Sequence, residues 1–583
     1  METDINLPTG SKVSLKYFHR QIKSISAETL TEQRNQKEKR EPSRRTRQKH
    51  KQLKCCFAKV HRSKSVANTL GGDRVSIRPS RNKFIKNYDF NFDFPQWGWC
   101  DVTFTSVAGH ITQIDFPKNC SWGSCLPNKL FEADIITYTS KSATDIANNI
   151  GNEARNSDIL MIWTDCDREG EYIGYEIVQA ANKTNPRMTV DSAFRAHFSF
   201  LERSHISHAA RNPTKLDKKA IAAVQTRTEL DLRTGASFTR FLTDLFKNEF
   251  RRELDSKTVI SYGGCQFPTL GFVVDRYKRI KAFKEEKFWY IGIDIRKGNI
   301  KTTFSWERPN IFDPLTAFCF FKNAYSEAGE EGEIINIEEK PTSNWAPLPL
   351  TTVELQKDCA RYFKMSAKEA LDTAEKLYNQ GFLSYPRTET DIFPKGMDLK
   401  KLIEKQSQSQ IWGSYASTLL NENKFRQPRE GKHDDKAHPP IHPIIWTDMG
   451  NFNDKEKKIY EYVTRRFLAC CSKDATGSKT TVKLKWGPEL FNATGLTVLE
   501  ENYLDVYPYQ QWKSSKKLPQ LTTNQKVKLS RAELIEGKTN PPNLMTETEL
   551  IALMDINGIG TDATIADHIE KILARQFRQY IFN

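Results

Sequence analysis

An apolar run passes directly into a cluster of acids in the stretch Ile159-Leu160-Met161-Ile162-Trp163-Thr164-Asp165-Cys166-Asp167-Arg168-Glu169-Gly170-Glu171. The first five residues are large and apolar, which is typical of a buried strand. The carboxylates that follow lie at its carboxyl end, where ligands bind in open α/β sheets. Clustered carboxylates repel each other unless a cation neutralises them, and Mg²⁺ suits oxygen ligands of this kind. The stretch therefore predicts an α/β domain with a magnesium-binding loop.

Two other interpretations of the acidic cluster remain open. One is an EF-hand-like loop, because acids and a glycine occupy its first, third, fifth, sixth and twelfth positions, namely Asp165, Asp167, Glu169, Gly170 and Glu176. The strand-like residues before the cluster and the cation of Arg168 argue against this loop. The other interpretation is a solvated acidic surface.

The pattern of apolar residues divides the chain into several regions. Residues 102–199 alternate short β-rich runs with helical patterns, which predicts an α/β domain with a parallel sheet. Residues 206–256 favour helices. Residues 286–345 and 478–537 alternate like strands, and the helical sequence 351–472 separates them. We therefore expect one domain to be inserted within another.

Charge and cysteine content limit the class of protein. The 583 residues include 88 Lys and Arg against 72 Asp and Glu, a net charge of +16, which favours a polyanionic partner such as nucleic acid. Eleven cysteines without a Cys-x-x-Cys pair indicate a reduced intracellular protein, and no apolar run is long enough to span a membrane. Residues 1–54 predict a disordered basic tail. Its basic run is typical of a nuclear address, and the alternatives are a solvated tail that contacts phosphates loosely and a mitochondrial transit segment.

A second candidate site surrounds Tyr385. Ser366 and Glu369 form a capping-box pattern at the start of a helix that ends near Gly381. Pro386 keeps Tyr385 in an extended, stiff conformation. A phenol is a poor nucleophile unless a neighbour stabilises its phenolate, and Arg387 faces the same side of an extended chain. The segment predicts a candidate tyrosine nucleophile.

Several motifs together resemble those of the type IA DNA topoisomerases, in the eukaryotic topoisomerase III alpha branch. The acidic stretch resembles the family's Toprim motif, and Ser384-Tyr385-Pro386-Arg387-Thr388-Glu389-Thr390 resembles its active-site tyrosine motif. Further matches are Ser261-Tyr262-Gly263-Gly264-Cys265-Gln266-Phe267-Pro268-Thr269-Leu270-Gly271, Lys436-Ala437-His438-Pro439-Pro440-Ile441-His442-Pro443 and Gly558-Ile559-Gly560-Thr561-Asp562-Ala563-Thr564.

The resemblance implies a multidomain toroid with an N-terminal Toprim domain, whose sheet is parallel. After the tail of residues 1–54, the Toprim domain would span residues 55–205. Residues 206–260 and 540–583 would form a helical domain that closes the ring. Residues 261–345 and 473–539 would form a β-rich arch, and residues 346–472 a helical domain that carries the tyrosine.

The resemblance also implies a reaction and roles for particular residues. Tyr385 would cleave single-stranded DNA through a 5′-phosphotyrosine without ATP, strand passage and religation would follow, and DNA junctions would be substrates. The metal ligands for Mg²⁺ would be Asp165, Asp167 and Glu169. Arg387, His438 and Lys59 would assist the chemistry, and Arg168, Arg195 and Gln266 would contact DNA. A RecQ-type helicase and an OB-fold protein would be partners, and no membrane is involved.

Both ends of the chain depart from the family pattern. Ala58 stands where the family has a glutamate, next to Lys59, and the matching sequence stops shortly before Asn583. Two interpretations remain open: an active enzyme with altered termini, or a chain that binds DNA and cleaves it poorly. A third function, a nucleic-acid-binding module without catalysis, would rest on the basic tail and on a helix-turn-helix pattern between Thr546 and Leu573.

Overall fold

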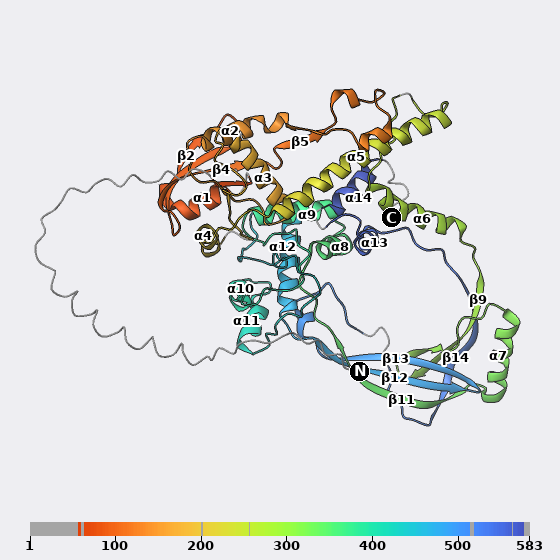
Figure 1. Cartoon of the computed structure of the whole chain (residues 1–583). Coiled ribbons are helices and arrows are strands. Elements are labelled where there is room, and N and C mark those ends of the chain that lie inside the picture. Colours follow the sequence, from red (N-terminus) through yellow and green to blue (C-terminus); the bar gives the residue numbers. More distant parts are fainter. Residues whose placement is uncertain are drawn as a thin grey trace, which may run out of the picture. The chain divides into compact units, whose positions relative to one another are not determined.

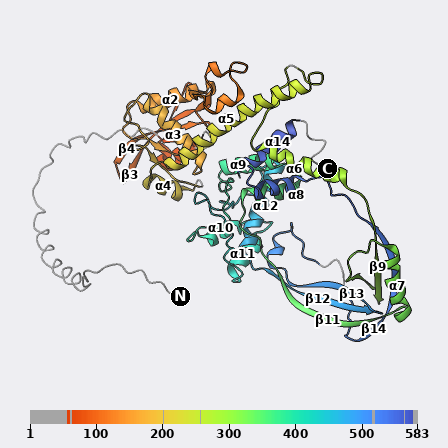
Figure 2. The ribbon, with the colours of Figure 1, turned by 45° about the vertical axis from the view of Figure 1, so that its right-hand side comes forward.

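The computed structural model describes residues 56–59, 63–199, 202–255, 257–513, 518–561 and 564–575 (Figures 1 and 2). The predicted basic tail lies outside this part of the chain. Within the described residues, no helix combines the length and the apolar composition that a membrane crossing requires.

The first sheet has six strands in the order β2-β3-β4-β1-β7-β8. Neighbours among β4, β1, β7 and β8 are parallel, as predicted. The sheet differs from the prediction at its other edge, where β2 and β3 are antiparallel, because the few residues between β3 and β4 permit only a hairpin. The strands are β1 (Cys56–Lys59), β2 (Ser76–Pro79), β3 (Lys86–Phe94), β4 (Gly98–Val107), β7 (Met161–Ile162) and β8 (Phe194–Arg195).

Helices cover both faces of this sheet. Alternate side chains of a strand point to opposite faces, so Leu160 and Ile162 pack in one core while Met161 and Trp163 pack in the other. The first core contains residues of α2 (Thr144–Ala154), α3 (Arg168–Asn182) and the start of α5 (Lys218–Glu249). The second contains residues of α1 (Ser63–Gly71) and α4 (Arg203–Arg211). Two short strands, β5 (Thr112–Asp115) and β6 (Ile136–Thr139), form a separate antiparallel pair.

The acidic stretch forms a strand, a short loop and a helix. Only Met161 and Ile162 pair as strand β7, and α3 begins at Arg168. The Asp167 side chain caps this helix by accepting a hydrogen bond from the Gly170 N–H at 2.7 Å. Helix α3 runs through Glu176, so these residues do not form the twelve-residue loop of an EF-hand, and that interpretation is wrong.

Six long strands form a closed barrel in the order β10-β13-β12-β11-β14-β9. The two β-rich blocks predicted from the sequence therefore pair with each other. Helix α7 (Pro314–Ala328) packs against β9 in both views (Figures 1 and 2). The strands are β9 (Lys287–Lys297), β10 (Ile300–Trp306), β11 (Glu331–Asn344), β12 (Ala475–Trp486), β13 (Glu489–Glu500) and β14 (Gln525–Lys538).

The chain leaves the barrel at the end of β11 and returns at the start of β12, where Asn344 pairs with Ala475. The intervening residues form the predicted helices around the largest apolar core. The capping box of Ser366 and Glu369 is confirmed at the start of α9. The helices are α8 (Thr352–Phe363), α9 (Ala367–Asn379), α10 (Leu399–Gln406), α11 (Gly413–Asn421) and α12 (Asp454–Cys470).

The last two helices, α13 (Glu547–Ile556) and α14 (Ile565–Ala574), bury their apolar faces against other elements. Ile551 and Ile569 share a core with Val273 of α6 (Gln266–Ala282), Val353 of α8 and Ala367 of α9. Thr546 and Glu549 form a capping box at the start of α13. These packed helices do not stand apart as a helix-turn-helix module. The predicted boundaries of the four domains stay a prediction.

Asp474 ties the helical excursion to the barrel, and we call residues 344–346, 471–475 and 500–502 the barrel joint. Its carboxylate accepts a hydrogen bond from the Ala346 N–H at 2.8 Å and pairs with Arg426. Its backbone carbonyl accepts a hydrogen bond from the Asn502 side chain at 2.8 Å. One residue, through its side chain and its backbone carbonyl, thus connects all three segments of the joint.

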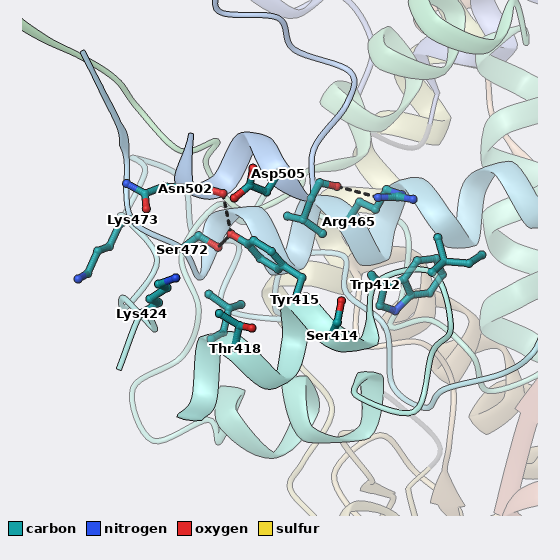
Figure 3. A pocket seen from close by; sticks show the side chains of 13 residues that line it. Trp412, Ser414, Tyr415, Thr418, Lys424, Arg465, Ser472, Lys473, Asn502 and Asp505 are labelled. Carbon is teal, nitrogen blue, oxygen red and sulfur yellow. Dashed lines mark hydrogen bonds between the residues drawn. The ribbon is translucent and has the colours of Figure 1, made fainter. Parts of the chain in front are cut away.

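A cavity of about 340 Å³ lies beside the barrel joint (Figure 3). Tyr415 of α11 points its hydroxyl into it, and this hydroxyl lies within hydrogen-bond distance of Ser472 Oγ at 2.9 Å and of the Asn502 carbonyl at 3.0 Å. None of the predicted catalytic, metal-binding or DNA-binding residues lines this cavity. It belongs to the joint rather than to the candidate active site.

Candidate active site

The Tyr385 segment is extended and held from both sides. The Ser384 N–H donates to the His442 carbonyl at 3.0 Å, which pairs this segment with residues 442–444. On the other side, Thr352 at the start of α8 donates its hydroxyl to the Pro386 carbonyl at 2.7 Å and accepts from the Thr388 N–H at 2.7 Å. The stiff, non-helical backbone predicted around Pro386 is therefore confirmed.

The Tyr385 hydroxyl contacts the acidic loop, which is residues 163–167 between β7 and α3. It donates a hydrogen bond to Asp167 Oδ2 at 2.8 Å, although the two residues are 218 positions apart in the sequence. The tyrosine is only 3% exposed. Burial, followed by the charges of Asp165 and Asp167, raises the pKa of Tyr385 well above its usual value, and Arg387 acts in the opposite direction. The phenol therefore keeps its proton at neutral pH in this arrangement.

His438 and Tyr378 surround the tyrosine ring. The His438 ring centroid lies 4.3 Å from that of Tyr385, and the Tyr378 centroid lies at 5.2 Å in an edge-on arrangement. The Asp435 carboxylate holds the loop of His438 in place. It accepts hydrogen bonds from the His438 backbone N–H at 2.9 Å and from the Thr388 hydroxyl at 2.8 Å. The structure thus places His438 beside Tyr385, as the resemblance implies.

Arg387 is paired with an acid that sequence reasoning missed. Its Nε donates to the Glu375 carboxylate on α9. Burial lowers the pKa of Arg387, but the charge of Glu375 and the hydrogen bond to it, together with the charges of Tyr385 and Asp167, outweigh this, so the pKa is raised overall and the guanidinium stays charged. Its charge acts on Tyr385 and on Asp167. The helical spacing of Glu375 gave no signal that it would meet Arg387.

The three predicted metal ligands do not converge. Asp165 is 2% exposed, and Asp167 contacts Tyr385. Glu169 instead pairs with Arg227 of α5 and hydrogen-bonds to His110 Nε2 at 3.2 Å. Burial opposes ionisation of Glu169, but hydrogen bonds from His110 and Arg227 outweigh it and lower the pKa of Glu169 to about 2. Glu169 is therefore a carboxylate that already has two cationic partners.

His110 links two acids of α3. Its Nδ1 lies 3.1 Å from Glu176 Oε2, in addition to its contact with Glu169. Hydrogen bonds to Glu169 and Glu176 raise the pKa of His110 to about 9, so the ring is protonated at neutral pH. His110 follows strand β4 closely, so the same argument about strand ends that selected Asp165 could have found it.

In this arrangement, the acidic loop supplies only some of the ligands that a divalent cation needs. In the described portion of the chain, no group of three or more His, Cys, Asp or Glu side chains is arranged to hold a metal ion. Asp165 and Asp167 nevertheless place carboxylates at the tyrosine, and Mg²⁺ in phosphoryl-transfer sites uses one or two carboxylates together with water and phosphate. The donor set therefore fits Mg²⁺ through these two residues.

Arg195 does not have the surface position that its predicted DNA contact requires. It is completely buried, and its guanidinium donates to Glu171 at 2.7 Å, to the Ala196 carbonyl at 2.8 Å and to the Asp165 carbonyl. It supports the loop of Asp165 from behind. The prediction is corrected for a physical reason: a guanidinium with no exposed surface cannot reach DNA in this conformation.

The remaining predicted residues have different surroundings. Arg168 is exposed at the start of α3, beside the acidic loop. Gln266 begins α6 and hydrogen-bonds to His568 of α14 at 3.1 Å. Strand β1 pairs Ala58 with Ser106 and Lys59 with Val107, which places its carboxyl end between β4 and β7. The side chain of Lys59 lies outside the described part of the structure.

Comparisons with known proteins find matches along most of the chain. Residues 78–199 match the Toprim domain, and residues 215–581 match the DNA topoisomerase family. The chain is 52% identical over 526 residues to DNA topoisomerase 3 of Candidozyma auris, an alignment that covers 90% of this chain and 82% of that protein. It is 50% identical over 561 residues to DNA topoisomerase 3 of Saccharomyces cerevisiae, covering 90% of this chain and 85% of that protein.

More distant relatives extend the similarity. Human DNA topoisomerase 3-alpha is 42% identical over 527 residues, which cover 90% of this chain and 51% of that protein. Topoisomerase I from Thermotoga maritima has the same fold, with a TM-score of 0.65, 22% identity, and coverage of 90% of this chain and 78% of that one. A Toprim domain at residues 78–199, followed by the topoisomerase module at residues 215–581, defines the class of protein as a DNA topoisomerase. The chain belongs to the type IA DNA topoisomerases.

Proposed function

We propose that Tyr385 is the nucleophile that cleaves single-stranded DNA. Its phenolate oxygen forms a bond to phosphorus, the bond from phosphorus to the 3′ oxygen breaks, and the DNA keeps a 5′-phosphate attached to Tyr385. The released 3′-hydroxyl attacks the same phosphorus in the reverse reaction. The observation that carries this proposal is the hydrogen bond from the Tyr385 hydroxyl to Asp167. The reaction exchanges one phosphodiester for another, so it needs no ATP.

The residues around the phenol supply the proton transfer and the charge. Asp167 Oδ2 already accepts the hydroxyl proton in a hydrogen bond, so it can take that proton as the oxygen attacks. Arg387 acts on the phenolate and counters the burial that keeps the phenol neutral. The His438 ring packs against the phenol and fixes its direction. These are the proposed roles of Asp167, Arg387 and His438 in the cleavage step.

The proposed cofactor is Mg²⁺. When bound, it would supply positive charge that stabilises the leaving 3′ oxygen and lowers the repulsion between the acids and the phosphate. Asp165 and Asp167 would hold it, and Glu169 would join them once it is released from Arg227 and His110. The chain's own residues hold the acids in place: Arg195 binds the carbonyl of Asp165, and Gly170 binds the carboxylate of Asp167.

Strand passage through the cleaved DNA would relax negative supercoils, decatenate DNA and dissolve recombination intermediates. The net charge of +16 and the exposed Arg168 beside the acidic loop support binding of single-stranded DNA and junctions. The relatives named DNA topoisomerase 3 support the same activity for this chain. A RecQ-type helicase and an OB-fold protein as partners, and a nuclear location, complete the proposal. Affinity capture and a fluorescent fusion would test these last points.

Trapping of the covalent adduct tests the nucleophile. The chain is incubated with single-stranded DNA and Mg²⁺ and quenched with detergent. A label at the 3′ end of the DNA should become attached to protein, and a label at the 5′ end should not. Tyr385→Phe should abolish the adduct. Tyr378→Phe is the matched control, because Tyr378 is a buried neighbour of the same ring. Loss of the adduct in the control alone would contradict the assignment.

A second candidate function is a DNA-binding chain that cleaves poorly. The observation that favours it is Ala58 in strand β1, next to the strand that leads into the acidic loop, where the family pattern has a glutamate. General acid or base groups contribute about 10²- to 10⁴-fold to a rate. If Ala58→Glu raises adduct formation by such a factor, the unaltered chain is the weaker enzyme. Equal adduct formation would reject this second function.

A further inference from the structure

A tight turn on the surface places two cysteines on its two sides. The turn contains Ser121, Trp122, Gly123 and Ser124, and the Ser124 N–H donates to the Ser121 carbonyl at 3.1 Å. The two serine hydroxyls also lie 3.0 Å apart. Gly123 has a φ of 87°, which a glycine adopts without strain. The residues that flank this closed turn are Cys120 and Cys125.

The two thiols are partly exposed and lie in contact. Both cysteines are free and neither is fully buried. Burial, followed by a hydrogen bond with the Cys125 thiol, raises the pKa of Cys120, while Arg240 lowers it. A β-turn brings its end residues, here Ser121 and Ser124, to within about 7 Å between Cα atoms, and each cysteine is the next residue beyond one of these ends. Disulfides span about 4.4–6.8 Å between Cα atoms. The closed turn and the hydrogen bond between the thiols therefore keep the flanking cysteines close to each other.

Contacts with helix α5 keep the turn in this position. The Arg240 side chain donates to the Ser121 carbonyl at 3.3 Å and lies over the Trp122 ring at 5.9 Å. Further along the same loop, Arg233 donates to the backbone carbonyls of Leu130, Phe131 and Ala133 at 2.8–3.0 Å. A turn that is anchored at several points keeps its thiols together and needs little movement to join them.

We propose that Cys120 and Cys125 are a modification site that forms a disulfide within the turn when the protein meets a peroxide. One thiol is oxidised by hydrogen peroxide to a sulfenic acid, and one water is released. The second thiol then attacks this sulfur, forms the S–S bond and releases a second water. Two thiols lose two hydrogen atoms and two electrons, and one peroxide is reduced to two waters. Nothing in the topoisomerase reaction uses this pair.

Selectivity follows from two partly exposed thiols on one turn, an arrangement that the other described cysteines lack. Cys100, Cys359, Cys470 and Cys471 are buried, the partly exposed Cys166 and Cys265 precede α3 and α6, and the exposed Cys319 lies on α7. An exposed disulfide is also readily reduced again by small thiols. The closed ring is short, so its effect on overall stability is small and the cross-link itself is the quantity to measure.

Tryptic mapping tests this proposal on the full chain. The protein is treated in its folded state with hydrogen peroxide, the remaining thiols are alkylated, and trypsin is added. Cleavage after Lys118 and Lys129 releases residues 119–129, a peptide with both cysteines and no others. We expect it to become lighter by two hydrogen atoms and to lose both alkylation sites, and dithiothreitol should restore them. The Cys319 peptide should keep its alkylation site.

Single variants separate an internal disulfide from simple oxidation. In Cys120→Ser and Cys125→Ser, the peptide should keep one alkylated cysteine or carry added oxygen, and it should never lose two hydrogen atoms. Both variants are expected to fold, because each thiol is partly exposed. The proposal is overturned if the unaltered peptide gains only oxygen, or if either cysteine cross-links to a thiol outside residues 119–129.

Discussion

Single residues determine the charge of the active site, and Tyr385 and Glu169 are held in opposite protonation states. Tyr385 is held neutral by burial, whereas Glu169 is held ionised by Arg227 and His110. The sequence could identify both residues as candidates, because a Toprim-like acid and a tyrosine before proline are local patterns. It could not show that Glu169 pairs with Arg227, because the two lie 58 positions apart and only the packing of α3 on α5 joins them.

Glu375→Gln should slow adduct formation by about tenfold. A hydrogen bond to a charged group is worth about 1.5–3 kcal/mol, and Arg387 loses that partner while the shape of the side chain is kept. Rates of adduct formation from 3′-labelled DNA measure the effect. Glu461→Gln is the matched control, because Glu461 pairs with Arg465 at 2.7 Å and the pair is absent from the active site. Equal slowing in both variants would refute a local role for Glu375.

His110 gives a pH dependence with a definite sign. The folded-state pKa of about 9 lies above the ordinary value of 6.5, so the protonated ring stabilises the fold fully below pH 6.5. That stabilisation is lost as the pH rises through about 9. In EDTA, the difference in melting temperature between the unaltered chain and His110→Gln should shrink from about pH 6 to about pH 10. His433→Gln, at an exposed ion pair, is the control.

Among the secondary-structure elements, the first turn of α3 determines the conformation of the acidic loop more than the length of this helix does. The sequence predicted the strand that leads into the acids and the capping box of Ser366, because these depend on neighbours within a few residues. It did not predict the antiparallel edge strands or the burial of Arg195, because these depend on which segments meet across the sheet. Local patterns thus located the elements, and long-range contacts determined their partners.

Gly170→Ala should destabilise the protein by about 1–3 kcal/mol, because the new Cβ would lie 1.8 Å from the Asp165 carbonyl oxygen. Helix α3 or the acidic loop must then shift. Gly235→Ala is the matched control, since nothing lies within 4 Å of its new Cβ in the middle of α5. That change should stabilise the protein by up to about 1 kcal/mol. Urea unfolding midpoints compare the two variants.

Across the whole molecule, the helical excursion and the barrel are connected through the barrel joint. Asp474→Ala removes the acceptor of the Ala346 N–H and the partner of Arg426. Loss of this acceptor leaves the N–H of the buried Ala346 without its partner, which costs about 1–3 kcal/mol, so local opening should become about ten to a hundred times more frequent. Residues 500–502 bond to the Asp474 backbone carbonyl and should change little, whereas hydrogen exchange should accelerate at residues 344–346. Unchanged exchange there, or a loss of Tyr385 adduct equal to that of Tyr385→Phe, would reject a local role.

The pairing of Asn344 with Ala475 has a consequence for how the chain folds. These partners are far apart along the chain, so their strand pairing must close a long loop, and such closure is slow because chain entropy opposes it. Folding of α8 to α12 brings the two ends together and shortens the effective loop. The excursion should therefore acquire protected amides before β11 pairs with β12 during refolding. Pulse-labelled hydrogen exchange can follow this order, and simultaneous protection of both parts would show that they fold as one unit.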